Sequence, residues 1–349
     1  IMAYTTINKS TDHFNIKLYT GTGSSLALTG VGFQPDMIWQ KVRSTTSSHR
    51  ITDVIRGTGQ VIYPNDTAEQ SAENAVTAFG ADGFTVGTGN SNAYNANGAT
   101  YVAWNWKAGT GQGSSNTDGS INTTYTSVNT TAGFSISQYT GTGANATVGH
   151  GLGVAPKIII TKSTSHTSNW GVYNKSIGAT KMLNLNQTNA AATNNGYFND
   201  TDPTSSVFSL GDEGNDTNGS GKTYIAYCFA EKTGFSKFGQ YRGNGDDDGA
   251  FVYTGFRPAL VILKRDDAVD GWFMYDTKRS PINVMDDYLI PNNNAAEVGT
   301  SAVNIDFVSN GFKLRNDDGG HNNSSGTYTY LSFAEASLVG SNNVPCTAR

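Results

Sequence analysis

One stretch occurs three times in this chain, and it constrains the fold more than any other feature of the sequence. The copies are residues 33–41, 154–162 and 256–264, each with a proline at its third position, an apolar run and a closing lysine. Proline fixes φ and has no N–H to donate, so it suits the first residue of a strand. The runs are rich in β-branched and aromatic residues. Each copy therefore predicts a buried strand whose lysine is solvated at the strand end.

Three further landmarks accompany each copy in the same order. The prolines Pro35, Pro156 and Pro258 lie 121 and 102 residues apart, far more than the roughly 20 to 50 residues of solenoid and propeller units. Each repeat is therefore the size of a domain. The landmarks are Tyr-x-Gly-x-Gly at 19–23, 139–143 and 241–245, a phenylalanine at 84, 208 and 312, and Thr-Tyr at 100–101, 223–224 and 327–328.

The composition predicts an all-β protein. Charged residues make up 15% of the chain, against roughly 25% in an average soluble domain, and there are 41 glycines. We expect three tandem domain-sized repeats, each a jelly-roll-like β-sandwich, with short arms at both ends. The expected parts are an N-terminal arm (1–13), repeat 1 (14–107), a Gly/Ser/Thr/Asn linker (108–132), repeat 2 (133–232), repeat 3 (233–336) and a C-terminal tail (337–349).

The pattern within the repeats gives finer expectations. In residues 101–106, Val102, Trp104 and Trp106 alternate with residues of the opposite face, as in a strand. Apolar residues at helical spacing in 69–79 suggest a short helix. The linker has room for a small hairpin, and its length leaves the first repeat free to stand apart, whereas repeats 2 and 3 are joined by a short turn.

Charge and hydropathy exclude several classes of function. The net charge of −5 and the lack of a Lys/Arg cluster argue against binding nucleic acid. No apolar run approaches the ~20 residues that span a bilayer, so we expect no membrane insertion. Residues 1–5 have no basic or apolar signal region, which predicts synthesis in a cytoplasm without a recognisable export route. Two cysteines, Cys228 and Cys346, do not form a disulfide framework.

Four aromatic residues are the candidate glycan contacts. Trp170 and Trp272 lie 14 residues after their prolines, and Tyr173 and Tyr275 lie 17 after them. In a strand, this spacing places the two rings of a repeat on opposite faces. The tryptophan is then a core anchor, or it is an exposed ring that stacks on a sugar. The equivalent position in the first repeat is His49.

The residues that could carry chemistry are sparse. Glu231 and Glu335 occupy matching places, and a structural role is expected for both. Asp212, Asp216 and Asn218 place oxygen ligands at spacings that suit a weak calcium loop, which lacks the bidentate glutamate. The five histidines are scattered, and no nucleophile elbow or phosphate loop occurs. The sequence therefore predicts a protein that is not an enzyme and has no cofactor, with Ca²⁺ as the one ion to consider.

Several segments together resemble a family of uncharacterised structural proteins of tailed bacteriophages, abundant in marine phages. They are residues 2–7, the Tyr-x-Gly-x-Gly motifs with their following prolines, 101–107, 224–231 and the ending 333–349. The resemblance covers nearly the whole chain, and Cys346 departs from the family's usual small or polar residue. It implies a virion component, namely a capsid decoration protein, a head fibre or a tail fibre.

The resemblance and the composition together set the expected partners. These are other virion proteins, in the capsid or tail, and further copies of the chain in a homo-oligomer such as a trimer. Two alternatives remain beside the structural role. One is a receptor-binding or glycan-binding adhesin that attaches to the host surface. The other is a polysaccharide-degrading tail protein, which the six glutamates disfavour because glycan hydrolysis needs two apposed carboxyl groups.

Overall fold

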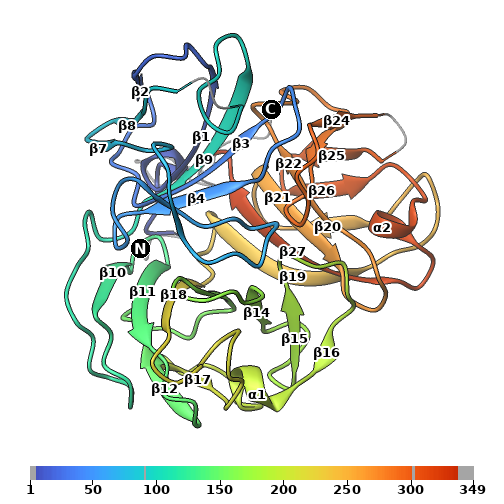
Figure 1. The fold of residues 1–349 in the computed structure, drawn as a ribbon. Coiled ribbons are helices and arrows are strands. Elements are labelled where there is room, and N and C mark those ends of the chain that lie inside the picture. The colour runs from blue at the N-terminus through green and yellow to red at the C-terminus, as the bar shows by residue number, and fades with distance from the viewer. Residues whose placement is uncertain (1–4, 90–91, 301–302, 337–349) are drawn as a thin grey trace.

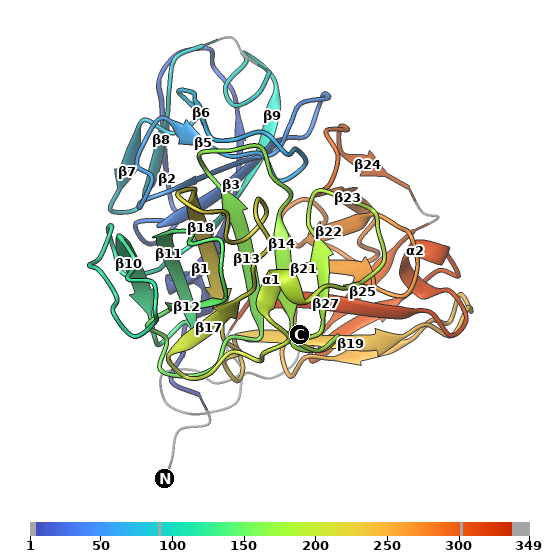
Figure 2. The same ribbon diagram turned by 60° about the horizontal axis from the view of Figure 1, so that its bottom comes forward.

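The computed structural model describes residues 5–89, 92–300 and 303–336, and nearly all of its regular structure is β. Three blocks of strands surround a common centre, coloured blue to cyan, green to yellow, and orange to red in Figure 1. We call residues 14–107 unit 1, residues 133–232 unit 2 and residues 233–336 unit 3. The turned view in Figure 2 shows the same three blocks.

Unit 1 contains a main sheet and a small sheet. The main sheet has the order β1 (Phe14–Thr20), β9 (Thr100–Trp106), β3 (Met37–Val42) and β4 (Arg50–Asp53), and the small sheet β2 (Leu26–Thr29), β8 (Gly83–Val86) and β7 (Ala78–Gly80). A short pair is formed by β5 (Gln60–Val61) and β6 (Ser71–Ala72), and the 3₁₀ turn η1 (Ser10–Asp12) precedes β1. All ladders of the unit are antiparallel.

Unit 2 repeats this arrangement with additional strands at both edges of its main sheet. The order is β10 (Tyr125–Asn129), β11 (Phe134–Thr140), β18 (Thr223–Phe229), β13 (Ile158–Ser163), β14 (Gly171–Asn174), β15 (Lys181–Asn184) and β16 (Ala192–Thr193). The small sheet consists of β12 (Ala146–Gly149) and β17 (Val207–Leu210), and α1 spans Asn195–Phe198.

Unit 3 follows the same plan. Its main sheet is β19 (Ser236–Arg242), β27 (Thr327–Ala334), β21 (Pro258–Arg265), β22 (Trp272–Asp276), β23 (Asp287–Leu289) and β24 (Val298–Gly299). The small sheet is β20 (Phe251–Tyr253), β26 (Gly311–Leu314) and β25 (Ile305–Val308), and α2 spans Gly319–Asn322. In the main sheets, the strand that ends in the Tyr-x-Gly-x-Gly motif pairs with the last strand of its unit, as β1–β9, β11–β18 and β19–β27. In the small sheets, the next strand pairs with the second-last strand of the unit, as β2–β8, β12–β17 and β20–β26. This nesting of pairs is jelly-roll-like.

Each main sheet is buried on both faces. One face packs against the small sheet of its own unit, as Tyr101 and Ala103 do in unit 1. The other face contributes to a central apolar cluster that all three units share, to which unit 1 supplies Val102, Trp104 and Trp106. The alternation predicted for this strand is therefore confirmed. Because both faces are covered, the strands of the main sheets read as nearly continuous buried runs.

A stacked tyrosine pair recurs in each small core. The tyrosine of the Tyr-x-Gly-x-Gly motif lies on the tyrosine of the Thr-Tyr motif, with ring centroids 4.8 Å apart in unit 1, 5.3 Å in unit 2 and 4.9 Å in unit 3. Offset-stacked rings at this distance are favourable beyond the area that they bury. The three pairs are Tyr19–Tyr101, Tyr139–Tyr224 and Tyr241–Tyr328. Two of the sequence landmarks therefore serve packing.

The structure differs from the sequence-based expectations in three places. Residues 69–79 form no helix but contribute the short strands β6 and β7, because their polar groups pair with other segments, as Glu73 does with Arg50. The described part of the expected N-terminal arm is not free, since Ile7 is 1% exposed within the central cluster. Unit 1 does not stand apart either: the linker ends in β10, which joins the main sheet of unit 2.

Candidate functional site

The four aromatic residues proposed as glycan contacts are all buried. Trp170, Tyr173 and Tyr275 are 0% exposed and Trp272 is 2% exposed, so a sugar cannot stack on them and the glycan-contact prediction is wrong for these rings. Each tryptophan lies in the central cluster, whereas Tyr173 and Tyr275 lie in the small cores of their units. The two rings lie on opposite sides of the strand, and both sides are buried. The core interpretation of the tryptophan therefore holds.

The two indoles also connect neighbouring units. Trp170 of unit 2 donates its Nε1 hydrogen to the carbonyl of Tyr63 in unit 1, at 2.9 Å. Trp272 of unit 3 donates to the carbonyl of Asn184 in unit 2, at 3.0 Å. At the equivalent position of unit 1, the Nε2 atom of His49 lies 3.1 Å from the carbonyl oxygen of Ile290 in unit 3. The three contacts close a ring in which each unit reaches the backbone of another.

The chemistry of His49 fits this contact between units 1 and 3, and we call each such contact between units a joint. The indole Nε1 of Trp39 donates to Nδ1 of His49 at 3.0 Å, so Nδ1 accepts and Nε2 carries the hydrogen that the carbonyl of Ile290 receives. Burial holds the pKa of His49 well below its usual value, and the nearby Lys41 lowers it further. The neutral imidazole therefore takes the place of the indole that the other two units use.

A second ring of joints is formed by the residues that lie 18 positions after Pro35, Pro156 and Pro258. In unit 1, Asp53 accepts a hydrogen bond from the hydroxyl of Tyr227 in unit 2, at 2.7 Å. In unit 3, Asp276 accepts one from the indole of Trp104 in unit 1, at 3.1 Å. In unit 2 the corresponding residue, Asn174, donates to the hydroxyl of Thr329 in unit 3. All three side chains act between units rather than around a cavity.

The two aspartates of this ring form buried ion pairs. Arg56 Nε lies 2.6 Å from Asp53, and Arg279 Nε lies 2.5 Å from Asp276, with side chains that are at most 1% exposed. Burial lowers the pKa of both guanidinium groups, but the adjacent carboxylates outweigh it and the net shift is upward. Unit 2 has Asn174 and an isoleucine at the equivalent positions, so the chain contains both a charged and a neutral form of one joint.

The lysines that close the three repeated strands are buried, which corrects the expectation that they are solvated. Lys41, Lys162 and Lys264 are each 0% exposed. Lys162 donates to the carbonyl of Thr67 in unit 1 at 3.0 Å, and Lys264 donates to that of Thr188 in unit 2 at 3.3 Å. Burial lowers the pKa of Lys41 to about 7 and of the other two lysines to about 8. Lys162 and Lys264 thus connect neighbouring units, whereas Lys41 donates to the carbonyl of Val42 in its own unit, at 2.7 Å.

The residues of the weak calcium loop are used in hydrogen bonds of the protein. Asp216 accepts from the backbone and the side chain of Asn169, at 2.7 and 3.0 Å, and also from the hydroxyl of Tyr197. Asn218 donates to two backbone carbonyls, each at 2.7 Å, and its oxygen accepts from the N–H of Thr142. Asp212 does not converge with them on a set of ligands: in the part of the chain that the structure describes, no group of three or more His, Cys, Asp or Glu residues could hold a metal ion.

The same asparagine recurs in each unit, a feature that sequence reasoning missed. Asn95 and Asn322 occupy the position of Asn218, and each donates to the carbonyls of two loops while its oxygen accepts a backbone N–H. The signal was present in the sequence, because each asparagine lies five residues before the threonine of the Thr-Tyr landmark. In all three units, a single asparagine side chain therefore ties these loops together.

The matching glutamates are also structural. Glu231 lies 2.8 Å from Lys157 and 2.9 Å from Lys237, and Glu335 pairs with Arg257. Burial raises the pKa of Glu231, but the two lysines outweigh it and the net shift is downward, so the carboxylate stays ionised. Cys228 is buried as well, and burial raises the pKa of its thiol, which keeps it protonated and unreactive.

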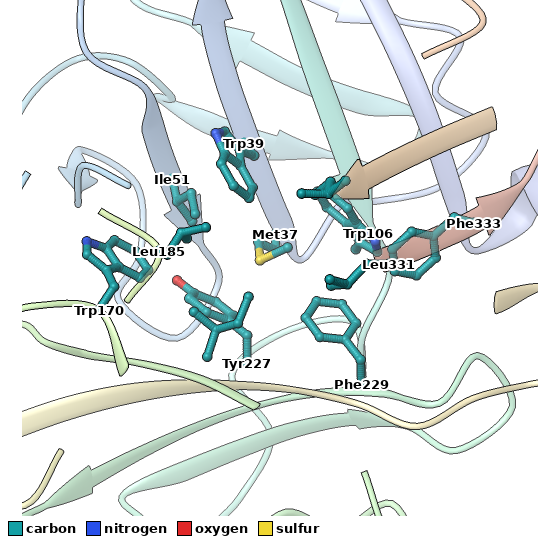
Figure 3. Close-up of a pocket in the computed structure, with 12 residues that line it drawn as sticks. Met37, Trp39, Ile51, Trp106, Trp170, Leu185, Tyr227, Phe229, Leu331 and Phe333 are labelled. Carbon is teal, nitrogen blue, oxygen red and sulfur yellow. The ribbon is translucent and has the colours of Figure 1, made fainter. Parts of the chain in front are cut away.

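Two hollows among the described residues could bear on function. The first lies at the common centre, has a volume of about 20 Å³ and is lined only by apolar and aromatic side chains from all three units (Figure 3). That is room for about one water, and a cavity without polar partners stays dry. The second is an open, polar hollow of about 370 Å³ on unit 1, lined by Arg50, Gly59, Ala72, Glu73, Asn74 and Tyr94.

Taken together, the fold and these contacts define a class of protein: an all-β body in which three sandwich units are tied together by rings of buried hydrogen bonds. A single family model matches residues 9–337, so one model spans all three units. The chain belongs to this family, which is described as a domain of unknown function (DUF7483). No curated protein and no solved structure matches the chain. None of the helices described is long and apolar enough to cross a membrane.

Proposed function

We propose that this chain is a non-enzymatic structural protein of a bacteriophage particle, such as a capsid decoration protein, a head fibre or a tail fibre. The observation that supports it best is the use made of the repeated polar and aromatic residues. Trp170, Trp272, Asp53 and Asp276 all join one unit to another, and none lines an open cavity. Buried contacts between all three units favour a rigid body, which suits a protein displayed on the surface of a particle. The resemblance of residues 101–107 and 224–231 to phage structural proteins supports the same role.

The proposed partners are other virion proteins of the capsid or tail, together with further copies of the chain in an oligomer such as a trimer. The protein would be made in the host cytoplasm and reside in the virion, without binding nucleic acid or inserting into a membrane. One of the two ends, residues 1–13 or residues 337–349, is the proposed anchor. Residues 1–4 and 337–349 lie outside the described part of the chain.

The test compares particles assembled with the parent chain and with shortened chains. One chain should lack residues 1–4 and another residues 337–349, because a cut beyond Ile7 would remove a residue of the central cluster. We expect at least one deletion to lower incorporation into purified particles while the circular dichroism spectrum is unchanged. Full occupancy after both deletions would refute anchoring by the ends. Images of particles without any density for this chain would refute the virion role itself.

A second candidate function, a host-surface glycan adhesin, is favoured by the polar hollow on unit 1. Its volume of about 370 Å³ lies in the range of small-ligand sites. Arg50 Nε lies 2.6 Å from Glu73, whose other oxygen accepts from the hydroxyl of Tyr63 at 2.6 Å. Planar polar groups beside aromatic rings suit hydroxyl recognition.

A glycan array tests this alternative, with Asn74→Ala as the variant and an exposed change far from the hollow, Val269→Ser, as the control. A hit that Asn74→Ala abolishes and Val269→Ser leaves intact would support the adhesin. No hits at high protein concentration would reject it. The third class, a polysaccharide-degrading tail protein, would return only if a polymer were cleaved and a single loop aspartate proved essential.

A further inference from the structure

The small sheets of units 2 and 3 differ at the edge formed by their first strands. In unit 2 the linker covers the edge of β12: the N–H of Ile121 donates to the carbonyl of Thr147 at 2.9 Å, and Ile121 bridges Val148 in parallel orientation. Ser120 and Thr147 exchange further hydrogen bonds, at 2.9 Å each. Ile121 is 7% exposed and belongs to the core of unit 2. The edge of unit 2 is therefore paired by another part of the chain.

The corresponding strand of unit 3, β20, has no such cover among the described residues. Units 2 and 3 are joined by only residues 230–235, so no linker is available to cover it. Within residues 5–89, 92–300 and 303–336, the strand that pairs with β20 is β26 alone. The carbonyl of Ala250 accepts from the N–H of Leu314, the last residue of β26, and the N–H of Thr254 donates to the carbonyl of Asn310, which precedes β26. Since alternate residues of a strand point their N–H and C=O groups to opposite sides, those of Phe251 and Tyr253 point to the free edge.

Two large aromatic side chains make this edge unusual. Phe251 is 48% exposed and Tyr253 is 59% exposed. The residues at the equivalent places in units 1 and 2 are Ala27 and Thr29, and Thr147 and Gly149, which have little apolar surface. An unpaired edge with exposed aromatic rings is a template for an added strand, and proteins usually protect such edges.

The described chain ends beside this edge. The N–H of Glu335 donates to the carbonyl of Arg257 at 2.9 Å, and Arg257 follows Tyr253 by four residues. The 13 residues from 337 to 349 span up to about 43 Å when extended, whereas the three residues of β20 need only about 10 Å. The segment therefore reaches the edge easily.

The composition and charge of the segment also match. Residues 337–349 combine serine, glycine and asparagine with aliphatic residues, as the linker does around Ile121. A course antiparallel to β20, starting at Arg257, would bring Arg349 toward the exposed aspartates Asp246 and Asp247 at the other end of the strand. We propose that the free edge of β20 is the docking strand for residues 337–349 of the same chain. Phe251 and Tyr253 are the side chains that this segment covers.

Hydrogen exchange tests the proposal directly. We expect the amides of Phe251 and Tyr253 to exchange at least tenfold more slowly in the full chain than in a chain ending at residue 336. A synthetic peptide of residues 337–349 should restore the protection, while the equivalent edge of unit 1, residues 26–29, is unaffected. Equal exchange in the two chains would overturn the proposal. Protection that grows with protein concentration would also overturn it, because the occupant would then belong to a second copy.

A second set of variants keeps the full length of the chain. Replacing Leu338, Val339 and Val344 together by aspartate should speed the exchange of β20 as the deletion does. In the chain ending at residue 336, Phe251→Ser combined with Tyr253→Ser should abolish binding of the peptide. The matched control is Val269→Ser, since Val269 is 70% exposed and lies outside β20. Peptide binding that survives the double variant would refute the role of the two rings.

Discussion

The buried joint at Asp53 gives the sharpest test of how the three units hold together. In Asp53→Ala, the guanidinium of Arg56 loses its carboxylate, the hydroxyl of Tyr227 loses its acceptor, and two backbone N–H groups lose theirs. All of these groups are inside the protein, so water cannot replace the lost partner. Breaking one side of a buried ion pair typically costs about 3 to 5 kcal/mol, because a buried charge is left uncompensated.

The magnitude translates into a measurable shift. For 349 residues, an unfolding entropy of ~2.1 cal/mol/K per residue gives ~0.7 kcal/mol/K, so the melting temperature should fall by about 4 to 7 °C. Unit 2 supplies the matched control, since it has Asn174 and Ile177 where unit 1 has Asp53 and Arg56. The double variant Asp53→Asn/Arg56→Ile should therefore lie within about 1 kcal/mol of the parent chain.

Thermal scans of the parent, the single variant and the double variant at one protein concentration would decide the matter. The double variant keeps an oxygen at position 53 for the hydroxyl of Tyr227 and for the backbone N–H groups, and it removes the charge that the single variant exposes. A loss below about 1 kcal/mol in the single variant would mean that the joint opens to water at little cost. A double variant as unstable as the single one would show that the aspartate, and not the orphaned arginine, decides the stability.

Three further predictions concern pH, the indole joints and calcium. Lys41 has a folded pKa of about 7 and an unfolded value near 10.4, so at this lysine the unfolded chain binds more protons between these values. Lys41 should therefore raise stability from pH 7 to 9 by at most ~1.4 kcal/mol per pH unit, and Lys162 and Lys264 should add to the rise above pH 8. Lys41→Met should remove the Lys41 part of this rise from the profile of melting temperature against pH. Trp272→Phe leaves the carbonyl of Asn184 without its donor and should cost about 1 to 3 kcal/mol in thermal scans, whereas a glycan-binding assay should not respond to this change. Asn218→Ala should destabilise the chain by a similar or larger amount, and adding Ca²⁺ or a chelator should leave the melting temperature of the parent unchanged; a calcium-dependent rise would show that Asp216 exchanges its protein partners for the ion.

The sequence by itself determined the local structure of this protein. Proline at the head of an apolar run, the period-two alternation of residues 101–106 and the repeated Tyr-x-Gly-x-Gly turns predicted the strands and the all-β class, because strand formation depends on neighbouring residues. The order of the landmarks predicted three similar stretches, and the three main sheets share a core of four strands in the same order, to which units 2 and 3 add further strands. The sequence did not decide whether Trp170 and Trp272 lie in the core or on the surface, since a period-two pattern does not tell which face of a sheet meets water.

Only the tertiary structure decided what covers those faces. The three main sheets turn one face toward a shared centre, so the two tryptophans connect neighbouring units there. Of the buried lysines that close the strands, Lys162 and Lys264 donate to neighbouring units. Lysine is almost never fully buried unless it is paired, so the sequence favoured a solvated end. The carbonyls that pair with Lys162 and Lys264 lie more than 70 residues away in sequence, and no local pattern reports such a partner. The burial and the hydrogen-bond partners of these tryptophans and lysines are thus set by contacts between units, which form only when the three units pack together.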